Sequence, residues 1–279
     1  MDYSGKVVVI TAAASGIGRE AALAFGRRGG RLVISDIDEA GIMRAAEEVR
    51  ATGAEVVGIR CDVSSDDDVA ALAARTFERF GQIDILMNHA GASASGPAGR
   101  IPLDDWRFVY EVNVLGIVRA LNAFFPHMVE RRSGLIINTS SGLGLFPEVP
   151  FALPYITTKA GVIGLSEALA LYCRPLGIRV MALLPDITKT QFHYSGRKTG
   201  LDPSKTKSLL PLSQEQLPVD VVNALMASID KNQFIACNIP NFDQFLIQKS
   251  KERNEPDYRV YAQVRNAVSD VVLSTVEQK

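Results

Sequence analysis

The chain is poor in the residues that build metal sites and disulfide frameworks. Its 279 residues include three cysteines and three histidines, all far apart along the sequence. Scattered cysteines of odd number do not form a disulfide framework, so we expect a reducing compartment, with the cytoplasm as the default. The isolated histidines lack the spacing of metal ligands, so no metal ion is expected.

The chain also lacks an excess of charge of either sign and any long apolar run. Lysine plus arginine number 30 and aspartate plus glutamate 31, which gives a formal net charge of -1. This balance provides no overall attraction to nucleic acid or to an anionic membrane. No run of about 18 apolar residues is present, so no transmembrane helix is expected. Hydrophobic residues still make up 47% of the chain, which is typical of a globular protein.

Two hydrophobic periods alternate along the sequence. Short β-branched runs such as Val7–Ile10 are followed by amphipathic helical stripes that end at glycines. This alternation indicates a parallel sheet covered on both faces, so we expect a doubly wound α/β fold with a mainly parallel seven-stranded sheet. The expected boundaries are one domain over 1–240, an irregular loop over 186–215, a C-terminal, partly helical extension over 241–279, and long helices over 103–131 in two pieces and over 155–174.

Small residues follow the first expected strand and open a helix. They run from Thr11 to Gly18, and small residues let the backbone approach a pyrophosphate at the helix N-terminus. Asp36 ends the second strand, where a carboxylate can accept hydrogen bonds from a ribose diol. The alternatives are a glycine turn that serves geometry alone and an aspartate that is merely solvated.

A tyrosine and a lysine are spaced to share one helix face. Tyr155 and Lys159 are four residues apart, and a cation near a phenol lowers the phenol pKa from its usual value of about 10. Such a tyrosine becomes a general acid or base near neutral pH. Because Y-x-x-x-K is common by chance, a surface pair is the alternative.

Together with four further motifs, these residues resemble the short-chain dehydrogenase/reductase family from about residue 5 to about residue 240. The further motifs occur in the family's order: Asn88 to Gly91 after the fourth strand, Asn113 in the next long helix, Ser141 after the fifth strand, and Pro185 to Thr190 after the sixth. The resemblance implies a Rossmann fold, a catalytic domain over 1–240 and hydride transfer between a nicotinamide cofactor and a substrate carbon.

The resemblance also implies a role for each matching position. Tyr155 would pass the hydroxyl proton, Lys159 would lower the tyrosine pKa and bind the nicotinamide ribose, and Ser141 would hold the substrate oxygen. Asn113 would anchor a water that connects Lys159 to solvent. The positions expected to bind the cofactor are Thr11, Ala12, Ser15, Gly16, Ile17, Gly18, Asp36, Asp62, Val63, Asn88, Ala90, Gly91, Tyr155, Lys159, Pro185, Thr188 and Thr190.

Charge indicates NAD as the cofactor rather than NADP. The Asp36 carboxylate would repel a 2′-phosphate, whereas a diol donates well to it. Relatives that accept NADP usually carry a basic residue just before Gly16 or just after the second strand, and those positions here are Ser15 and Ile37.

The sequence departs from the family pattern in three places. Ala12 replaces the first glycine of the cofactor turn, which is harmless only if its φ is negative. Asp186 replaces the glycine after Pro185, and we expect it to face solvent rather than the substrate. Ser141 and Tyr155 are separated by one residue more than is usual, which predicts a bulge between them and makes Ser140 the weaker candidate for the serine role.

The expected substrate site is apolar. Its predicted walls are residues 91–97, 143–151 and 186–215, which carry many large apolar side chains and few fixed charges. This lining suits a lipophilic secondary alcohol or its ketone. The expected substrate contacts are Ser141, Leu143, Phe151, Phe192 and His193.

Two alternatives to an alcohol dehydrogenase stay open: an epimerase or dehydratase on the same scaffold, and a nucleotide-sensing protein without catalysis. The resemblance also implies a two-fold interface between long helices, so a homodimer or homotetramer is expected.

Overall fold

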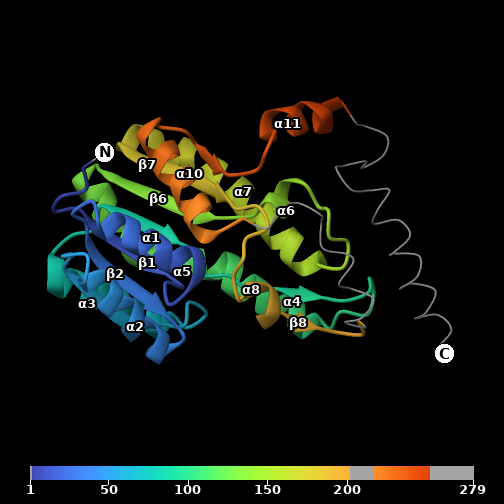
Figure 1. The fold of residues 1–279 in the computed structure, drawn as a ribbon, viewed down its shortest axis with the longest axis horizontal. Coiled ribbons are helices and arrows are strands. Elements are labelled where there is room, and N and C mark those ends of the chain that lie inside the picture. The colour runs from blue at the N-terminus through green and yellow to red at the C-terminus, as the bar shows by residue number, and fades with distance from the viewer. Residues whose placement is uncertain (1, 202–215, 252–279) are drawn as a thin grey trace.

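A seven-stranded parallel sheet forms the centre of the molecule. The computed structural model describes residues 2–201 and 216–251 (Figure 1). The strands lie in the order β3-β2-β1-β4-β6-β7-β9, so the order reverses between β1 and β4. A crevice outside the strand ends is expected at such a reversal. The strands are β1 (Val7–Thr11), β2 (Arg31–Asp36), β3 (Val56–Arg60), β4 (Ile85–Asn88), β6 (Gly134–Thr139), β7 (Ile178–Leu184) and β9 (Ile235–Cys237).

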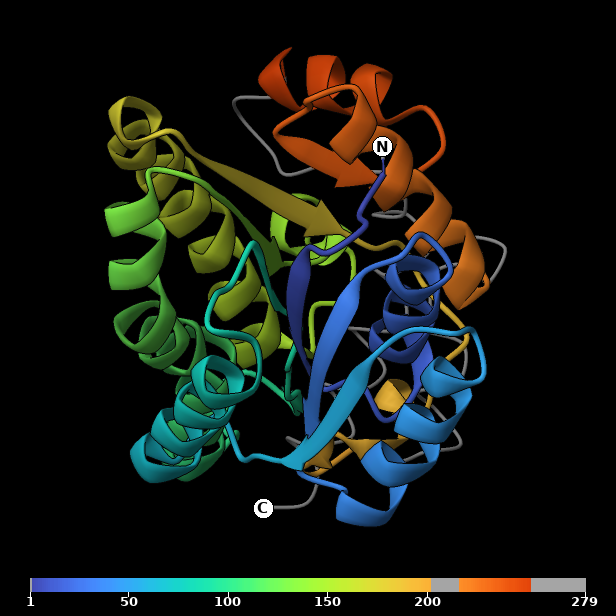
Figure 2. The same ribbon diagram turned by 90° about the vertical axis from the view of Figure 1, so that its left-hand side faces the viewer.

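Helices cover both faces of this sheet (Figure 2). One layer holds α1 (Gly16–Gly26), α2 (Glu39–Arg50) and α10 (Pro218–Asp230), and the other holds α3 (Asp66–Phe80), α5 (Gly116–Arg131) and α7 (Leu153–Cys173). The predicted doubly wound Rossmann fold is therefore confirmed. The remaining elements are a two-stranded sheet of β5 (Ala94–Ser95) and β8 (Arg197–Lys198), with α4 (Leu103–Tyr110), the π-helix Glu111–Leu115, α6 (Gly142–Leu145), the 3-10 turn Arg174–Leu176, α8 (Phe192–Ser195) and α11 (Phe242–Lys251).

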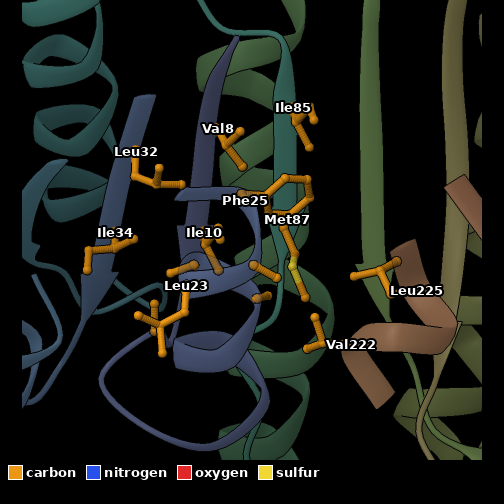
Figure 3. Close-up of a cluster of buried hydrophobic side chains, with 14 of the residues drawn as sticks. Val8, Ile10, Leu23, Phe25, Leu32, Ile34, Ile85, Met87, Val222 and Leu225 are labelled. Atoms are coloured by element: carbon orange, nitrogen blue, oxygen red, sulfur yellow. The ribbon is translucent and has the colours of Figure 1, made fainter. Parts of the chain in front are cut away.

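The central strands are apolar on both faces, which explains their unbroken β-branched sequence. Val8 and Ile10 of β1 point into the core beneath α1 and α10, where they meet Phe25 and Leu225 (Figure 3). Val9, between them, points to the opposite core beneath α3 and α5. Each β1 side chain is thus buried, and the strand ends at the crevice.

The long helical stretch Leu103–Arg131 forms part of the second layer. By length and composition alone it could cross a membrane, and it is the one such stretch among the described residues. Its Ala120, Phe124 and Met128 are buried against the sheet, while only 33% of its apolar window is buried within the chain. The two helical pieces expected here are α4 and α5, which a π-helical turn joins without a break in the helix.

Two boundaries differ from expectation. The helix that carries Tyr155 begins at Leu153 rather than at Tyr155, with a proline in its first turn, where the missing N–H is not needed. In the segment expected to be irregular, residues 186–201 include α8 and β8, and β8 pairs with β5. Residues 202–215 and 252–279 lie outside the described residues.

Candidate active site

The turn after β1 is held to the turn after β4. Thr11, at the end of β1, accepts hydrogen bonds through Oγ1 from the N–H groups of His89 (3.0 Å) and Ala90 (3.1 Å). Ala12 has a φ of 55°, so the residue that replaces glycine does adopt the left-handed conformation. This conformation costs about 1–2 kcal/mol for a residue with a side chain.

The N-terminus of α1 differs from those of α2 and α3. Asp38 and Ser65 cap α2 and α3 with side-chain hydrogen bonds, whereas Ser15 makes no side-chain cap at α1, whose first turn also has no acidic residue. Unfilled N–H groups at a helix N-terminus are suited to a phosphate. A Cβ on Gly18 would lie only 2.2 Å from the carbonyl oxygen of Ala12, so the close turn requires glycine there.

These features fit a dinucleotide. Ser15, Gly16 and Ile17 start α1 at the C-terminal end of β1. Asp36, at the end of β2, accepts hydrogen bonds from the N–H groups of Ala14 (Oδ2, 3.0 Å) and Asp38 (Oδ1, 3.0 Å), which fixes its carboxylate beside the turn. Both oxygens keep capacity for a further donor such as a ribose hydroxyl.

A serine and a tyrosine meet beyond the ends of β6 and α7. Ser141, on the turn after β6, places its side chain near the hydroxyl of Tyr155. Burial raises the pKa of Tyr155 to about 12, and the nearby Ser141 side chain acts in the opposite direction. The expected lowering of the tyrosine pKa by Lys159 is not found in the protein alone, because desolvation outweighs the other contributions.

Lys159 lies on the same face of α7, one turn after Tyr155. Its Nζ lies 5.7 Å from the centre of the Tyr155 ring and donates to the carbonyl oxygen of Thr139 (2.7 Å). Burial lowers the pKa of Lys159 to about 8. The ammonium is therefore close to the phenol but is aligned by a backbone carbonyl rather than by the phenol itself.

Asn113 lies in the π-helical turn, and such turns are frequent at functional sites. Its side chain accepts from the N–H of Ala92 (2.7 Å) and donates to the Ala92 carbonyl oxygen (3.0 Å) and to Thr158 Oγ1 (2.9 Å). Both amide hydrogens are thus used by the protein, and the side chain joins the turn after β4 to α7. The expected water link to Lys159 stays a prediction.

Several other expected cofactor positions have structural partners. Asn88 donates to Asn138 Oδ1 (2.9 Å), and Asp62 Oδ1 accepts from both the N–H (2.9 Å) and the hydroxyl (2.6 Å) of Ser64. Val63 packs against Gly116 of α5. These contacts explain each residue without a ligand, so their cofactor roles stay predictions.

The turn after β7 reaches the cofactor turn. Pro185 accepts a hydrogen bond from the N–H of Gly142 (2.9 Å), and the Thr188 hydroxyl donates to the Asp186 carbonyl oxygen (2.7 Å). A Cβ on Gly16 would lie 3.0 Å from Thr190 Cγ2, so Thr190 lies over the start of α1. Gly91 lies opposite, where a Cβ would be 3.5 Å from Lys159 Nζ.

Asp186 does not face solvent as expected. Its Oδ1 accepts from the N–H of Ile187 (2.9 Å), while its Oδ2 is buried with no hydrogen-bond partner in the part of the chain that the structure describes. Its own N–H donates to Asn238 Oδ1 (3.1 Å), at the end of β9. This bond from the Asp186 backbone to the Asn238 side chain joins the ends of β7 and β9 and holds Asp186 inward.

The three predicted substrate walls converge. The N–H of Gly96 donates to the Phe151 carbonyl oxygen (2.9 Å), and β5 pairs with β8. The Phe192 ring lies 5.5 Å from the Tyr155 ring, and Leu143 is partly exposed beside Ser141. Phe151 is 4% exposed and packs within the wall, and the side chain of His193 lies outside the described residues.

Sequence reasoning missed several groups around this site. Ser140 is buried and donates to the Lys159 carbonyl oxygen (2.7 Å), which leaves Ser141 as the serine that meets Tyr155. Thr139 accepts from Lys159, but through a backbone atom that no side-chain motif reveals. Glu148, 5% exposed, places a carboxyl group in a wall expected to carry few charges.

Comparison with known proteins identifies the family. The family described as short chain dehydrogenase matches residues 6–199. A curated relative, a subunit of (2S)-[(R)-hydroxy(phenyl)methyl]succinyl-CoA dehydrogenase from Thauera aromatica, is 34% identical over 190 residues, which cover 68% of this chain and 76% of the relative.

Solved structures of the same family, one in complex with NAD and one with NADPH, give the same result. A short-chain dehydrogenase/reductase from Burkholderia phymatum in complex with NAD has a TM-score of 0.84 and 29% identity, covering 92% of this chain and 98% of its own. A short-chain dehydrogenase from Sphingobium yanoikuyae in complex with NADPH has a TM-score of 0.74 and 27% identity, covering 90% and 97%. From its fold, its matched residues and these relatives, the chain belongs to the short-chain dehydrogenase/reductase family of oxidoreductases.

Proposed function

We propose that this protein is an NAD-dependent oxidoreductase that interconverts a lipophilic secondary alcohol and its ketone, with Tyr155 as the general acid or base. The placement of the Ser141 side chain near the hydroxyl of Tyr155, with Lys159 Nζ 5.7 Å from the Tyr155 ring, carries the proposal. These two hydroxyl groups lie where the three walls meet and can both reach one substrate oxygen. Lys159 supplies positive charge beside them.

The protonation states favour carbonyl reduction at neutral pH. With a pKa raised to about 12, Tyr155 is protonated and can give its proton to the carbonyl oxygen of a ketone. Ser141 holds that oxygen and stabilises the charge that develops on it. When bound, the nicotinamide cofactor supplies the hydride. Lys159, held by the Thr139 carbonyl, stabilises the phenolate that Tyr155 becomes after proton transfer.

The proposed substrate class rests on the apolar wall around Tyr155. The Phe192 ring lies 5.5 Å from the Tyr155 ring at a tilt of 50°, and Leu143 is partly exposed next to Ser141. An aromatic ketone fits such a wall through ring contacts as well as apolar burial. The name of the Thauera relative also describes a secondary alcohol that bears a phenyl group.

The proposed preference for NAD rests on charge around Asp36. Arg60 is paired with Asp68 (2.7 Å), and Arg19 is paired with Glu48. Arg19 follows Ser15 by four residues and Arg60 lies opposite Asp36 in the register of β2 and β3, and both are thus already paired with carboxylates. Ile37, next to Asp36, is 61% exposed and carries no charge.

We also propose that the protein works as a homodimer at least. Leu171 and Tyr172 of α7 are 73% and 67% exposed, and Phe125 of α5 lies 6.2 Å from Tyr172. Large apolar side chains gathered on neighbouring helices are typical of an isologous interface. Light scattering at micromolar concentration should give twice the chain mass, and a monomer would contradict the proposal.

The three free cysteines support a reducing compartment such as the cytoplasm.

A panel of ketones tests the activity. Purified protein is mixed with NADH and with aryl ketones, steroid ketones or small polar ketones, and the loss of reduced-nicotinamide absorbance is followed. We expect turnover with at least one aryl or steroid ketone and little with the polar set. Conversion of substrate without any change in nicotinamide absorbance would instead indicate an epimerase or dehydratase, and cofactor binding without conversion would indicate a sensing protein.

A further inference from the structure

Helix α11 packs on the short helix that follows Ser141. In Figure 1, α11 lies on the same side of the molecule as α6 and α7. Phe242 and Phe245 of α11 make edge-to-face contacts with Phe146, with ring centres 6.1 and 6.0 Å apart. Phe146, which directly follows α6, is 1% exposed. Since α11 lies beyond the family match at residues 6–199, this contact is not part of the matched region.

A lysine of α11 completes the end of α6. Lys249 Nζ donates a hydrogen bond to the carbonyl oxygen of Leu145, the last residue of α6, and lies 5.8 Å from the centre of the Phe146 ring. The last carbonyl groups of a helix accept no hydrogen bond within the helix, and their partial negative charge favours a nearby cation. Burial lowers the pKa of Lys249, which shows that the contact removes the ammonium partly from water.

The other end of α6 is Ser141 itself. Its Oγ accepts from the N–H of Leu143 (3.2 Å), so Ser141 is the N-cap of this four-residue helix. Between the two ends, a Cβ on Gly144 would lie 2.7 Å from the backbone carbon of Lys159. Helix α6 therefore packs closely against α7 through Gly144 and is also in contact with α11 at its C-terminal end.

We propose that Phe242, Phe245 and Lys249 are positioning residues that hold α6, and through it set the place of the Ser141 hydroxyl and of the wall over 143–151. A helix of four residues forms one turn and has little stability of its own, so its position depends on packing from outside. The expected effect on catalysis rests on the proposed function, whereas the packing of α11 on α6 is independent of it.

The first test measures the segment directly and needs no activity. Lys249→Ala and Phe245→Ala are compared with Lys251→Ala, a matched change on the same helix at an exposed residue. Hydrogen exchange at the amides of Phe146 and Glu148, which bond to Gly142 and Phe146 (2.8 and 2.9 Å), should be about 5- to 10-fold faster in the first two variants. Exchange equal to that of Lys251→Ala would overturn the proposal.

The second test separates positioning from general stability. With an aryl ketone that the panel identifies, Lys249→Ala should raise KM about 5- to 10-fold and lower kcat less, while KM for NADH stays the same. Lys249→Arg should restore most of the loss, because arginine also donates to a carbonyl and stacks on an aromatic ring. Equal impairment of the ketone KM, the kcat and the NADH KM in Lys249→Ala would contradict a positioning role. Failure of Lys249→Arg to restore the ketone KM would also contradict it.

The two tests also separate this inference from the proposed function. If no ketone is turned over but exchange at Phe146 rises in Lys249→Ala, the proposed function is wrong and the fastening of α6 by α11 stands. If ketones are turned over and neither exchange nor KM changes, the proposed function stands and this inference is wrong.

Discussion

The cofactor side and the substrate side of the crevice are built in different ways. On the proposed cofactor side, the expected binding residues are the last residues of strands: Thr11 ends β1 and Asp36 ends β2. On the substrate side, the walls are short pieces, α6, α8 and β8, held by contacts such as that of Leu145 with Lys249, 104 residues apart. The position of a turn at a strand end is fixed by the sheet, whereas the position of a short helix or strand in the wall depends on side-chain packing.

This difference predicts where substitutions act. A change on the substrate side should alter the chemistry or the choice of substrate and leave cofactor binding intact. A change on the cofactor side should alter the choice of cofactor or the stability of the fold and leave the proton path intact.

The largest effect is expected from removal of the phenol. Tyr155→Phe should fold, bind NADH with unchanged affinity, and lose about 10²- to 10⁴-fold in kcat/KM, because the proton donor is lost while the ring packing against Phe192 remains. NADH affinity is measured by fluorescence titration alongside the kinetics. A variant that keeps half of the activity would show that another group moves the proton.

Substitution of the two neighbouring serines should lower kcat by different amounts. Ser141→Ala should lower kcat about 10- to 100-fold, because a hydroxyl that contacts the substrate oxygen is removed. Ser140→Ala is the matched control and should lower kcat less than about 3-fold, with a loss of about 1 kcal/mol of stability from its buried bond to Lys159. The reverse order of the two activities would mean that Ser140 turns toward the substrate.

A change on the cofactor side should shift selectivity alone. The unmodified protein should prefer NAD over NADP by at least about 10-fold in kcat/KM, a difference of about 1.4 kcal/mol. Asp36→Ala with Ile37→Arg should move this ratio toward NADP by removing a repulsive charge and adding an attractive one. The aryl ketone KM should not change, and equal use of both cofactors by the unmodified protein would contradict the role of Asp36.

The smallest effect concerns the strained turn. Ala12→Gly should raise the free energy of unfolding by about 0.5 kcal/mol, since relief of the positive φ exceeds the extra freedom that glycine has in the unfolded chain. Ala13→Gly, at a buried neighbour not in that conformation, should lower it instead. Urea unfolding measures both variants, and a loss of stability in Ala12→Gly would mean that the methyl group makes compensating contacts.

The site could be predicted to different depths on its two sides. The strand-end residues Thr11 and Asp36 were located from the sequence, because alternating strands and helices bring those ends to one edge of the sheet, and Ser141 was located from the resemblance to the family. The inward direction of Asp186 was missed because it depends on Asn238, 52 residues later. The burial of Glu148 and the raised pKa of Tyr155 were missed because burial is a property of the packed molecule.

The sequence by itself thus determined the doubly wound sheet and the positions along it of the serine, the tyrosine and the lysine. Its hydrophobic periods indicate the sheet, its spacing of four along one helix indicates the tyrosine and the lysine, and its resemblance to the family indicates the serine. Only the tertiary structure decided that Asp186 is held inward, that Ala12 is strained, and that α11 reaches α6. Each of these depends on atoms brought together from distant segments by close packing, and no local pattern encodes such contacts.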